Sequence, residues 1–517
     1  MRTLVTSDVD VCFTNPGTSE MHFVAALDSV PEMRAVLGLV EGVVTGAADG
    51  WARMTGRPAG ALLHLGPGLG NGLANLHNAR RARTPLIAIV GEHAHQHQGL
   101  QAPLESDIAT VARNVATWVR TSATPGAVGT DAAEAVAAAH GPPGKVATLI
   151  LPADVSWTDG GAVADPLPVP ARAAVAADIV AEVADTLRTG GPTLLLLGGS
   201  AVADPVAIAD AHRIGDATGA RVMTDVFPTR VARGAGRAPL ERIAYFPEEA
   251  QEQLAGLAHV VLVEAQPPVS FFAYPGERSR PTPQGCTFHT LAGAADDGVA
   301  ALAALAEEVG VAPATALVDA ARPGRPSGRL DPATVAAAVG ALLPEGAIVS
   351  DEAVTSSAPL PDATAGAPPH DWLTLTGGAI GQGLPVATGA ALACPDRPVL
   401  ALQADGGALY TIQSLWTQAR EGLDVTTVIY SNASYEILSV EMARVGVEGA
   451  GPRAEALFDL TGPRPDFVAL AEGFGVPATR AATAEQLNDR LEAALATPGP
   501  ALIEAMIPRA GGGGTQG

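Results

Sequence analysis

Two consecutive segments decide the fold, and they read VLALQADGG (residues 399–407) and VTTVIYSNASY (residues 425–435). Each begins as a continuous apolar run of strand length and ends in small polar residues, and a stretch with helical character, residues 409–420, lies between them. Apolar strands separated by helices are typical of parallel sheets covered on both faces. We therefore expect Asp405 and Asn432 at the carboxyl ends of neighbouring strands, the edge where such sheets bind ligands.

Asp405 and Asn432 together suit a magnesium site. A carboxylate and an amide oxygen, with a nearby backbone carbonyl, are the hard ligands that suit Mg²⁺ bridging a diphosphate. Gly406 and Gly407 would let the backbone approach phosphates closely, and the amino terminus of the following helix favours negative charge. Alone, Asp405 could cap that helix and Asn432 could close a turn. Their placement on consecutive strand ends favours the metal site.

The same alternation of apolar runs and Ala-rich helical stretches extends over the whole chain, for example at residues 86–90 and 193–197. It predicts the α/β class with doubly wound parallel sheets. Two Pro- and Gly-rich stretches, residues 165–170 and 322–328, divide the chain into segments of similar size. We predict three doubly wound parallel-sheet domains and a flexible tail, with bounds 1–165, 171–325, 330–510 and 511–517.

Composition limits the partners of the protein. The formal net charge of −23 over 517 residues argues against nucleic acid, because binding to phosphates needs a basic surface. Residues 1–10 lack the apolar core of a signal peptide, and no apolar run has membrane-spanning length, so we expect no membrane association and a cytoplasmic location. The cysteines show no metal-ligand spacing and are expected to be free packing residues; they are Cys12, Cys286 and Cys394.

The segment after residue 399 resembles thiamine-diphosphate-dependent enzymes of the benzoylformate decarboxylase and acetohydroxyacid synthase (acetolactate synthase large subunit-like) group, which share the motif Asp-Gly followed by a distant Asn. The resemblance implies three Mg²⁺ ligands, which are the side chains of Asp405 and Asn432 and the carbonyl oxygen of Ser434. It implies further cofactor contacts at Gly406, Gly407 and Tyr435. Ala404 and Ser431 stand where the family usually has Gly and Asn, but neither change removes a ligand.

A second family-like motif, TGGAIGQGLP, occupies residues 376–385. The resemblance implies that Ile380 wedges between the two rings of the cofactor and that the Gly378 carbonyl accepts a hydrogen bond from its amino group. Without the resemblance, this Gly-rich stretch would be interpreted as a turn.

The first segment supplies the other half of the expected site. Glu41 follows a short apolar strand, and the resemblance assigns it to the aminopyrimidine ring, where a partly buried carboxyl can shuttle a proton. Thr18 matches an active-site Ser of benzoylformate decarboxylases and His64 matches their active-site His. The alternatives are a helix-start Glu and a core His. Asn71 is assigned to the cofactor site, and its run GPGLGNG (residues 66–72) lacks the third Gly of a dinucleotide fingerprint.

The substrate pocket is the least determined part of the site. Residues that could shape it, and that could equally be core, are Pro103, Leu104, Phe271, Phe272, Ile437 and Leu438. His93, His95 and His97 lack the further partners of a zinc site, and we expect them in a loop near the substrate.

The resemblance implies a pyrimidine-binding, a central and a diphosphate-binding domain, and a homodimer or homotetramer with cofactor between subunits. The expected reaction is decarboxylation of a small 2-oxo acid, with possible carboligation. The alternatives are a carboligase of the acetolactate synthase type and a cofactor-binding scaffold without catalysis. Typical synthases also bind FAD in the central domain, and we expect none here because residues 171–325 show no flavin signature.

Overall fold

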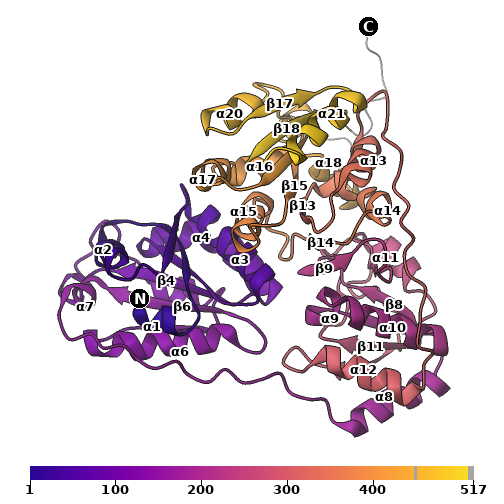
Figure 1. Cartoon of the computed structure of the whole chain (residues 1–517), viewed down its shortest axis with the longest axis horizontal. Helices are drawn as coiled ribbons and strands as arrows, with labels where there is room; N and C mark the ends of the chain where they lie inside the picture. The colour runs from indigo at the N-terminus through magenta and orange to yellow at the C-terminus, as the bar shows by residue number, and fades with distance from the viewer. Residues whose placement is uncertain (448–450, 510–517) are drawn as a thin grey trace.

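The computed structural model describes residues 1–447 and 451–509. The predicted tail at 511–517 and the last residue of the predicted third domain, residue 510, lie outside these described residues. Three sheets follow one another along the chain, coloured indigo to violet, magenta, and orange to yellow in Figure 1. Each has helices on both faces, which confirms the predicted α/β class.

The first sheet has six parallel strands in the order β2-β1-β3-β4-β6-β5. Its strands are β1 (Val11–Asn15), β2 (Arg34–Leu37), β3 (Ala59–Leu63), β4 (Leu86–Glu92), β5 (Trp118–Thr121) and β6 (Val146–Pro152). Its helices are α1 (Arg2–Thr6), α2 (Met21–Ala26), α3 (Glu41–Thr55), α4 (Leu65–Ala82), α5 (Ile108–Ala112), α6 (Val128–His140) and α7 (Ala153–Trp157). Alternate residues of the strands pack on α3 and α4 on one face and on α1 and α6 on the other.

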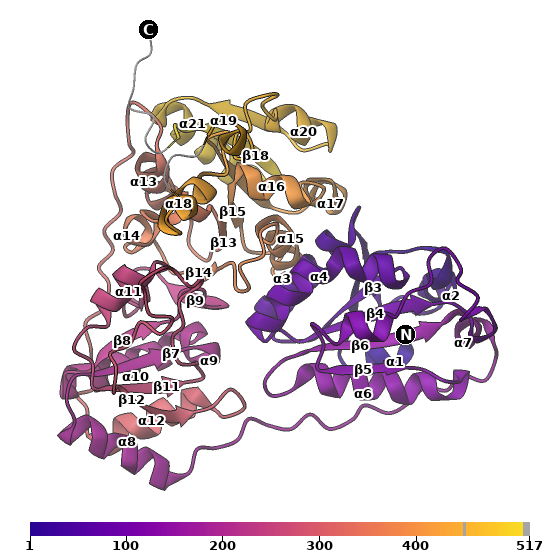
Figure 2. The same cartoon turned by 180° about the vertical axis from the view of Figure 1, so that it is seen from behind.

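An extended connection, residues 158–176, leads to the second sheet (Figures 1 and 2). This sheet is also parallel, in the order β10-β8-β7-β11-β12. Its strands are β7 (Thr193–Leu197), β8 (Arg221–Thr224), β10 (Glu241–Arg242), β11 (His259–Val263) and β12 (Thr287–Ala292). Its helices are α8 (Ala177–Thr189), α9 (Gly199–Ala203), α10 (Pro205–Thr218), α11 (Pro247–Gln253) and α12 (Gly298–Val309).

The third sheet has seven strands in the order β17-β18-β16-β15-β13-β14-β9. Its strands are β9 (Arg230–Arg233), β13 (Ile348–Glu352), β14 (His370–Leu373), β15 (Val399–Ala404), β16 (Val425–Ser431), β17 (Ala478–Ala481) and β18 (Ala501–Met506). Its helices are α13 (Pro332–Leu342), α14 (Leu360–Thr364), α15 (Gly383–Ala393), α16 (Asp405–Thr411), α17 (Ser414–Glu421), α18 (Glu436–Arg444), α19 (Pro452–Glu455), α20 (Phe467–Gly473) and α21 (Ala484–Leu495).

One strand departs from the parallel pattern. β9 belongs to the middle segment of the chain, yet it pairs antiparallel with β14 and forms the edge of the third sheet. The pairing is reinforced by Arg230, whose Nε lies 2.9 Å from Oδ1 of Asp371. The middle segment is therefore joined to the third sheet by main-chain hydrogen bonds as well as by sequence.

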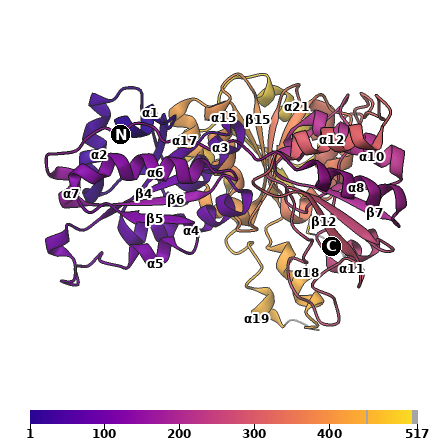
Figure 3. The same cartoon turned by 90° about the horizontal axis from the view of Figure 1, so that it is seen from below.

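The first and third units share one hydrophobic core, because α3 packs closely on α15. Glycines at the crossing make this approach possible. A Cβ atom on Gly50 would lie 2.1 Å from the carbonyl oxygen of Val386, and one on Gly389 would lie 1.9 Å from that of Ala47. Figure 3 shows this contact between the indigo and orange units, and it shows α18 and α19 projecting from the third unit. α18 lies beside α11, where Arg444 pairs with Glu248.

Candidate active site

The carboxyl ends of β15 and β16 meet as predicted. The two strands pair in parallel up to Ala404 and Tyr430, so the loops that follow are neighbours. Asp405 is only 3% exposed, and its Oδ2 accepts a hydrogen bond from the Ala433 N–H at 2.6 Å. Its Oδ1 accepts from the Gly406 N–H at 2.8 Å. The carboxylate therefore links the Asp-Gly turn to the loop that carries Asn432.

This loop suits a divalent cation. Asn432 turns its Oδ1 onto the Ser434 N–H at 2.9 Å, and Ala433 between them adopts a left-handed conformation with φ of 53°. Burial raises the pKa of Asp405, even though its backbone hydrogen bonds act in the opposite direction. A cation beside the carboxylate would offset that desolvation, and carboxylate, amide and carbonyl oxygens are the ligands that Mg²⁺ takes. The donor set fits the metal.

The neighbouring glycines have a packing reason that sequence analysis did not supply. A Cβ on Gly406 would lie 2.4 Å from the ring of Tyr435, and one on Gly407 would lie 2.5 Å from Oε1 of Glu352. Packing against protein side chains thus favours glycine at both positions.

The loop with Gly378 and Ile380 is anchored by Glu352, a residue that sequence analysis missed. The Glu352 carboxylate is buried and accepts the backbone N–H groups of Gly381 (2.7 Å), Gln382 (2.7 Å) and Gly383 (2.5 Å). Burial raises the pKa of Glu352, and these hydrogen bonds act against that rise. Gly378 has φ of 75°, a conformation that favours glycine. Glu352 thus positions the loop.

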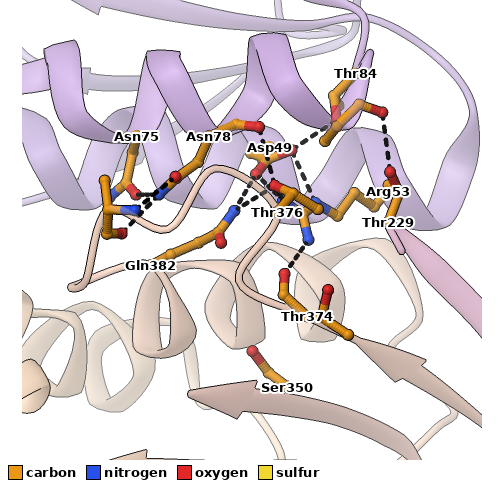
Figure 4. Close-up of polar contacts among 12 residues, drawn as sticks. Asp49, Arg53, Asn75, Asn78, Thr84, Thr229, Ser350, Thr374, Thr376 and Gln382 are labelled. Atoms are coloured by element: carbon orange, nitrogen blue, oxygen red, sulfur yellow. Dashed lines mark hydrogen bonds and ion pairs between the residues drawn. The ribbon is translucent and has the colours of Figure 1, made fainter. Parts of the chain in front are cut away.

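The other face of this loop is held by the first unit. Asn75 Nδ2 donates to the carbonyls of Gly42 (2.8 Å) and Gly381 (3.1 Å), and Asn78 Nδ2 donates to that of Ala379 (2.8 Å). Figure 4 shows these amides of α4 beside the loop, together with a buried network around Asp49. The loop is therefore fixed from two units of the same chain.

Glu41 is the first residue of α3 and is 7% exposed. Its Oε2 accepts a hydrogen bond from Nδ2 of Asn71 at 3.0 Å. A Cβ on Gly68 would lie 3.0 Å from Glu41 Oε1 and 3.4 Å from the Cβ of His64. Glu41 and His64 therefore both lie beside the bare backbone of Gly68.

His64 is oriented by Glu20, the second residue that sequence analysis missed. Oε2 of the buried Glu20 lies 2.8 Å from Nδ1 of His64 and also accepts the Gly17 N–H at 2.8 Å. With the proton on Nδ1, a neutral His64 presents the lone pair of Nε2. A Cβ on Gly17 would lie 2.2 Å from the His64 ring, so the ring packs on Gly17. The next residue, Thr18, is exposed and begins the 3₁₀ helix η1 (Thr18–Glu20).

The six pocket candidates lie in three places. Phe271 packs on the loop that carries Gly378 and Ile380, because a Cβ on Gly378 would lie 2.3 Å from the Phe271 ring. Phe272 packs edge-on against Phe271, with the ring centroids 4.8 Å apart. Ile437 and Leu438 belong to α18, directly after the Asn432 loop. The exposed turn with Pro103 and Leu104 approaches α4 through Ser106, which contacts Gly66.

The three histidines after β4 form no metal site. His95 Nδ1 lies 2.9 Å from Asp154, and His93 and His97 stack with ring centroids 5.2 Å apart. Within residues 1–447 and 451–509, no three His, Cys, Asp or Glu side chains are grouped to hold a metal ion. The same described residues contain no helix that is long and apolar enough to span a bilayer.

The candidate residues thus form two groups. The first-unit group is Thr18, Glu20, Glu41, His64 and Asn71, and the third-unit group is Gly378, Ile380, Asp405, Asn432, Ser434 and Tyr435. Among the described residues, no hydrogen bond joins a member of one group directly to a member of the other. One group offers a buried carboxyl and an oriented imidazole, and the other offers hard oxygen ligands.

Comparison with known proteins identifies the family. Residues 1–112 match the N-terminal TPP binding domain of thiamine pyrophosphate enzymes, and residues 362–505 match their C-terminal TPP binding domain. The chain is 57% identical over 512 residues to "Putative acetolactate synthase large subunit IlvX" of Mycobacterium tuberculosis, covering 98% of each chain. It is 30% identical over 536 residues to benzoylformate decarboxylase of Pseudomonas aeruginosa, covering 95% of each.

The fold leads to the same group of proteins. The solved structure of the thiamine diphosphate-dependent 4-hydroxybenzoylformate decarboxylase of Rhodococcus jostii matches with a TM-score of 0.81 and 26% identity, covering 98% of each chain. The chain therefore belongs to the thiamine pyrophosphate enzymes and is a thiamine-pyrophosphate-dependent enzyme related to both benzoylformate decarboxylases and acetolactate synthases.

Proposed function

We propose that the enzyme decarboxylates a 2-oxo acid non-oxidatively, with thiamine diphosphate and Mg²⁺ bound at the edge of the third sheet. The observation that carries the proposal is the buried Asp405 carboxylate, which accepts a hydrogen bond from the Ala433 N–H in the loop of Asn432. The reaction class follows from the relatives, one a benzoylformate decarboxylase aligned over 95% of its length.

The chain's own residues would hold the cofactor in two ways. Asp405, Asn432 and the Ser434 carbonyl would bind the metal, and the loop of Gly378 and Ile380 would receive the rings. When bound, thiamine diphosphate supplies a nucleophilic carbon and an electron sink for the carbon–carbon bond. The Glu352 carboxylate keeps the loop in one conformation, which limits the ordering that binding must induce.

Proton transfer would fall to the first-unit group. Asn71 orients the Glu41 carboxyl by a hydrogen bond to Oε2, so a proton can be held or released at that position. His64 is held by Glu20 through Nδ1, which leaves Nε2 free to accept a proton from a substrate near Gly68 or to donate one to it. Thr18 follows Gly17, on which this imidazole packs, and its exposed side chain could bind the substrate carboxylate.

An aromatic or other apolar substrate side chain suits the surroundings of Gly378. Phe271 covers this glycine and packs with Phe227 at 5.9 Å and Tyr245 at 5.2 Å between ring centroids. Aromatic pairs in these orientations are favourable, and a substrate ring could extend them.

A complete site would require a second copy of the chain. Because the two groups form no direct hydrogen bond within one chain, we propose a homodimer or homotetramer in which each group meets its complement on the partner.

Carboligation of the acetolactate synthase type is the second candidate, and the 57% identity to the M. tuberculosis protein favours it. The two activities would share the residues above and differ in whether a second carbonyl compound is admitted. Acetolactate formed from pyruvate would identify the carboligase, whereas free aldehyde would identify the decarboxylase.

The test is CO₂ release from a panel of 2-oxo acids with aromatic, branched and small side chains, with and without thiamine diphosphate and Mg²⁺. Glu41→Gln should lower kcat by roughly 10²–10⁴-fold, the usual contribution of acid–base catalysis. The exposed Glu252→Gln in α11 serves as the control. If no acid on the panel loses CO₂ and pyruvate yields no acetolactate, both candidate functions are wrong.

A further inference from the structure

The central sheet has the crevice at which nucleotides bind in open α/β folds. β7 and β11 are adjacent and parallel, but the chain leaves β7 towards β8 and leaves β11 towards β12, on opposite sides. Such a reversal opens a crevice at the carboxyl ends of the two strands, and ligand phosphates bind there against glycine-rich turns. In this chain the turn after β7 is Gly198-Gly-Ser200, and the residue after β11 is Glu264.

The carboxylate of Glu264 fills that crevice. Glu264 is 3% exposed. Its Oε1 accepts hydrogen bonds from Ser200 Oγ at 2.5 Å and from the Gly298 N–H, at the start of α12, at 3.1 Å. Its Oε2 accepts the Ser200 N–H at 2.8 Å and lies 3.3 Å from Nη1 of Arg172. Both oxygens are thus bound by donors of the kind that receive a phosphate.

Glycines surround this carboxylate closely. A Cβ on Gly199, whose φ is 51°, would lie 2.0 Å from Oε2, and a Cβ on Gly298 would lie 2.6 Å from Oε1. Glycines in nucleotide-binding turns give a phosphate the same close approach to the backbone. Here they give it to a side chain of the protein itself.

The backbone of Glu264 is held in the conformation that aims its side chain inward. Its φ of 53° is left-handed, which is unfavourable for any residue with a Cβ. Its N–H donates to the Ala292 carbonyl at 2.8 Å, and its own carbonyl accepts from Nη1 of Arg83, in the first unit, at 3.0 Å. The surrounding contacts thus sustain a strained backbone at this position.

We infer that Glu264 is a built-in anion that occupies the phosphate position of the central crevice, so that this domain takes neither FAD nor another nucleotide diphosphate. A diphosphate would have to displace a carboxylate that is held by three hydrogen-bond donors and an arginine, and it would bring like charge against it. The residues present therefore do not fit the flavin that typical synthases bind in this domain, and the domain instead uses the crevice to tie Arg172 and Arg83 to its sheet.

The test compares the wild-type enzyme with Glu264→Gly and Glu264→Gln. Glycine tolerates the left-handed backbone and leaves a space of carboxylate size, whereas glutamine keeps the volume and loses the charge. Formate, compared with chloride at equal ionic strength, should raise the melting temperature of Glu264→Gly by roughly 2–4 °C or more. The same exchange of anion should not change the melting temperatures of the wild-type enzyme and Glu264→Gln. The wild-type enzyme should bind neither ADP nor FAD in calorimetric titrations and should contain no flavin after purification.

Binding of FAD or ADP to the wild-type enzyme would overturn the inference. So would an equal response of all three proteins to formate, because the anion would then act elsewhere. If Glu264→Gly does not fold, two measurements still test the inference. The wild-type enzyme should bind neither nucleotide in the titrations, and Glu264→Gln should melt at a lower temperature than the wild-type enzyme. An unchanged melting temperature in Glu264→Gln would show that the charge is not needed.

Discussion

Removing the charge of Asp49 should destabilise the contact between the first and third units. Asp49 and Arg53 have fully buried side chains and form a two-point ion pair, with Nε to Oδ1 at 3.0 Å and Nη2 to Oδ2 at 2.7 Å (Figure 4). The carboxylate also accepts from Thr84 Oγ1 at 2.7 Å and from Gln382 Nε2 at 2.8 Å. Gln382 belongs to the loop after Ile380, so the network ties α3 to the candidate cofactor loop.

Asp49→Asn leaves Arg53 buried without a counter-ion and turns an amide towards two donors. Breaking a buried pair from one side costs about 3–5 kcal/mol, so we expect that loss in the free energy of unfolding. Arg53→Met should cost a similar amount, since it leaves the carboxylate unpaired. The double variant should cost less than the sum by about 2 kcal/mol, within the coupling seen between directly contacting residues.

Urea unfolding followed by circular dichroism measures these differences, taken from the midpoints at a common slope. Asp10→Asn is the matched control, because the Asp10–Arg57 pair has side chains that are 41% and 40% exposed and should contribute less than about 1 kcal/mol. If Asp49→Asn shifts the midpoint no more than Asp10→Asn, or if the two single effects simply add, the buried pair does not carry the contact.

The other predictions concern the first-unit and third-unit groups of the site, the loop held by Glu352, and the dependence of stability on pH. Subunit exchange between inactive Glu41→Gln and Asp405→Ala proteins should restore up to about a quarter of wild-type activity if each site draws on two chains; no recovery refutes the shared site. Glu352→Ala should weaken thiamine diphosphate binding in a fluorescence titration, since three backbone N–H groups lose their acceptor at roughly 1 kcal/mol or more each; unchanged affinity would show that the loop stands without it. Burial lowers the pKa of His370 from 6.5 to about 4, so the unfolded chain binds a proton at pH values between 6.5 and 4 that the folded chain does not bind. The free energy of unfolding should therefore fall as the pH drops from 6.5 to 4, by at most ~3 kcal/mol. His370→Asn should flatten that dependence while the exposed His97→Gln keeps it, and equal slopes in all three proteins would contradict the assignment.

The sequence was sufficient to predict the elements that are set by a few consecutive residues. β15, its Asp-Gly turn and β16 with its Asn loop are each set by a few consecutive residues, and the pairing of adjacent strands brings Asp405 to Ala433. Glu20 and Glu352 were missed because their partners are distant in sequence; His64 is 44 residues from Glu20. Parallel pairing of Asn15 with Leu63 brings the two loops together, and a predicted order with β1 beside β3 would have indicated it.

The middle segment was least predictable for a related reason. β9 is four residues long and pairs with a strand beyond residue 369, so its antiparallel register depends on the docking of whole units and not on its own pattern. The approach of Phe271 to Gly378 depends on that same docking. Its role beside the loop could not be distinguished from core packing until the units were placed.

The buried carboxylates of this fold are stabilised in two ways. Asp49, Asp371 and Glu264 are each buried beside an arginine, which offsets the cost of removing the charge from water. Asp405 and Glu352 are as deeply buried, but among the described residues no Lys or Arg forms an ion pair with either, and both carboxylates accept backbone N–H groups instead. Asp405 differs from Glu352 in that the loop of Asn432 and Ser434 adds further oxygen donors beside it, and this is where we propose that a divalent cation binds. The central crevice reverses the arrangement, because there the protein provides the anion itself.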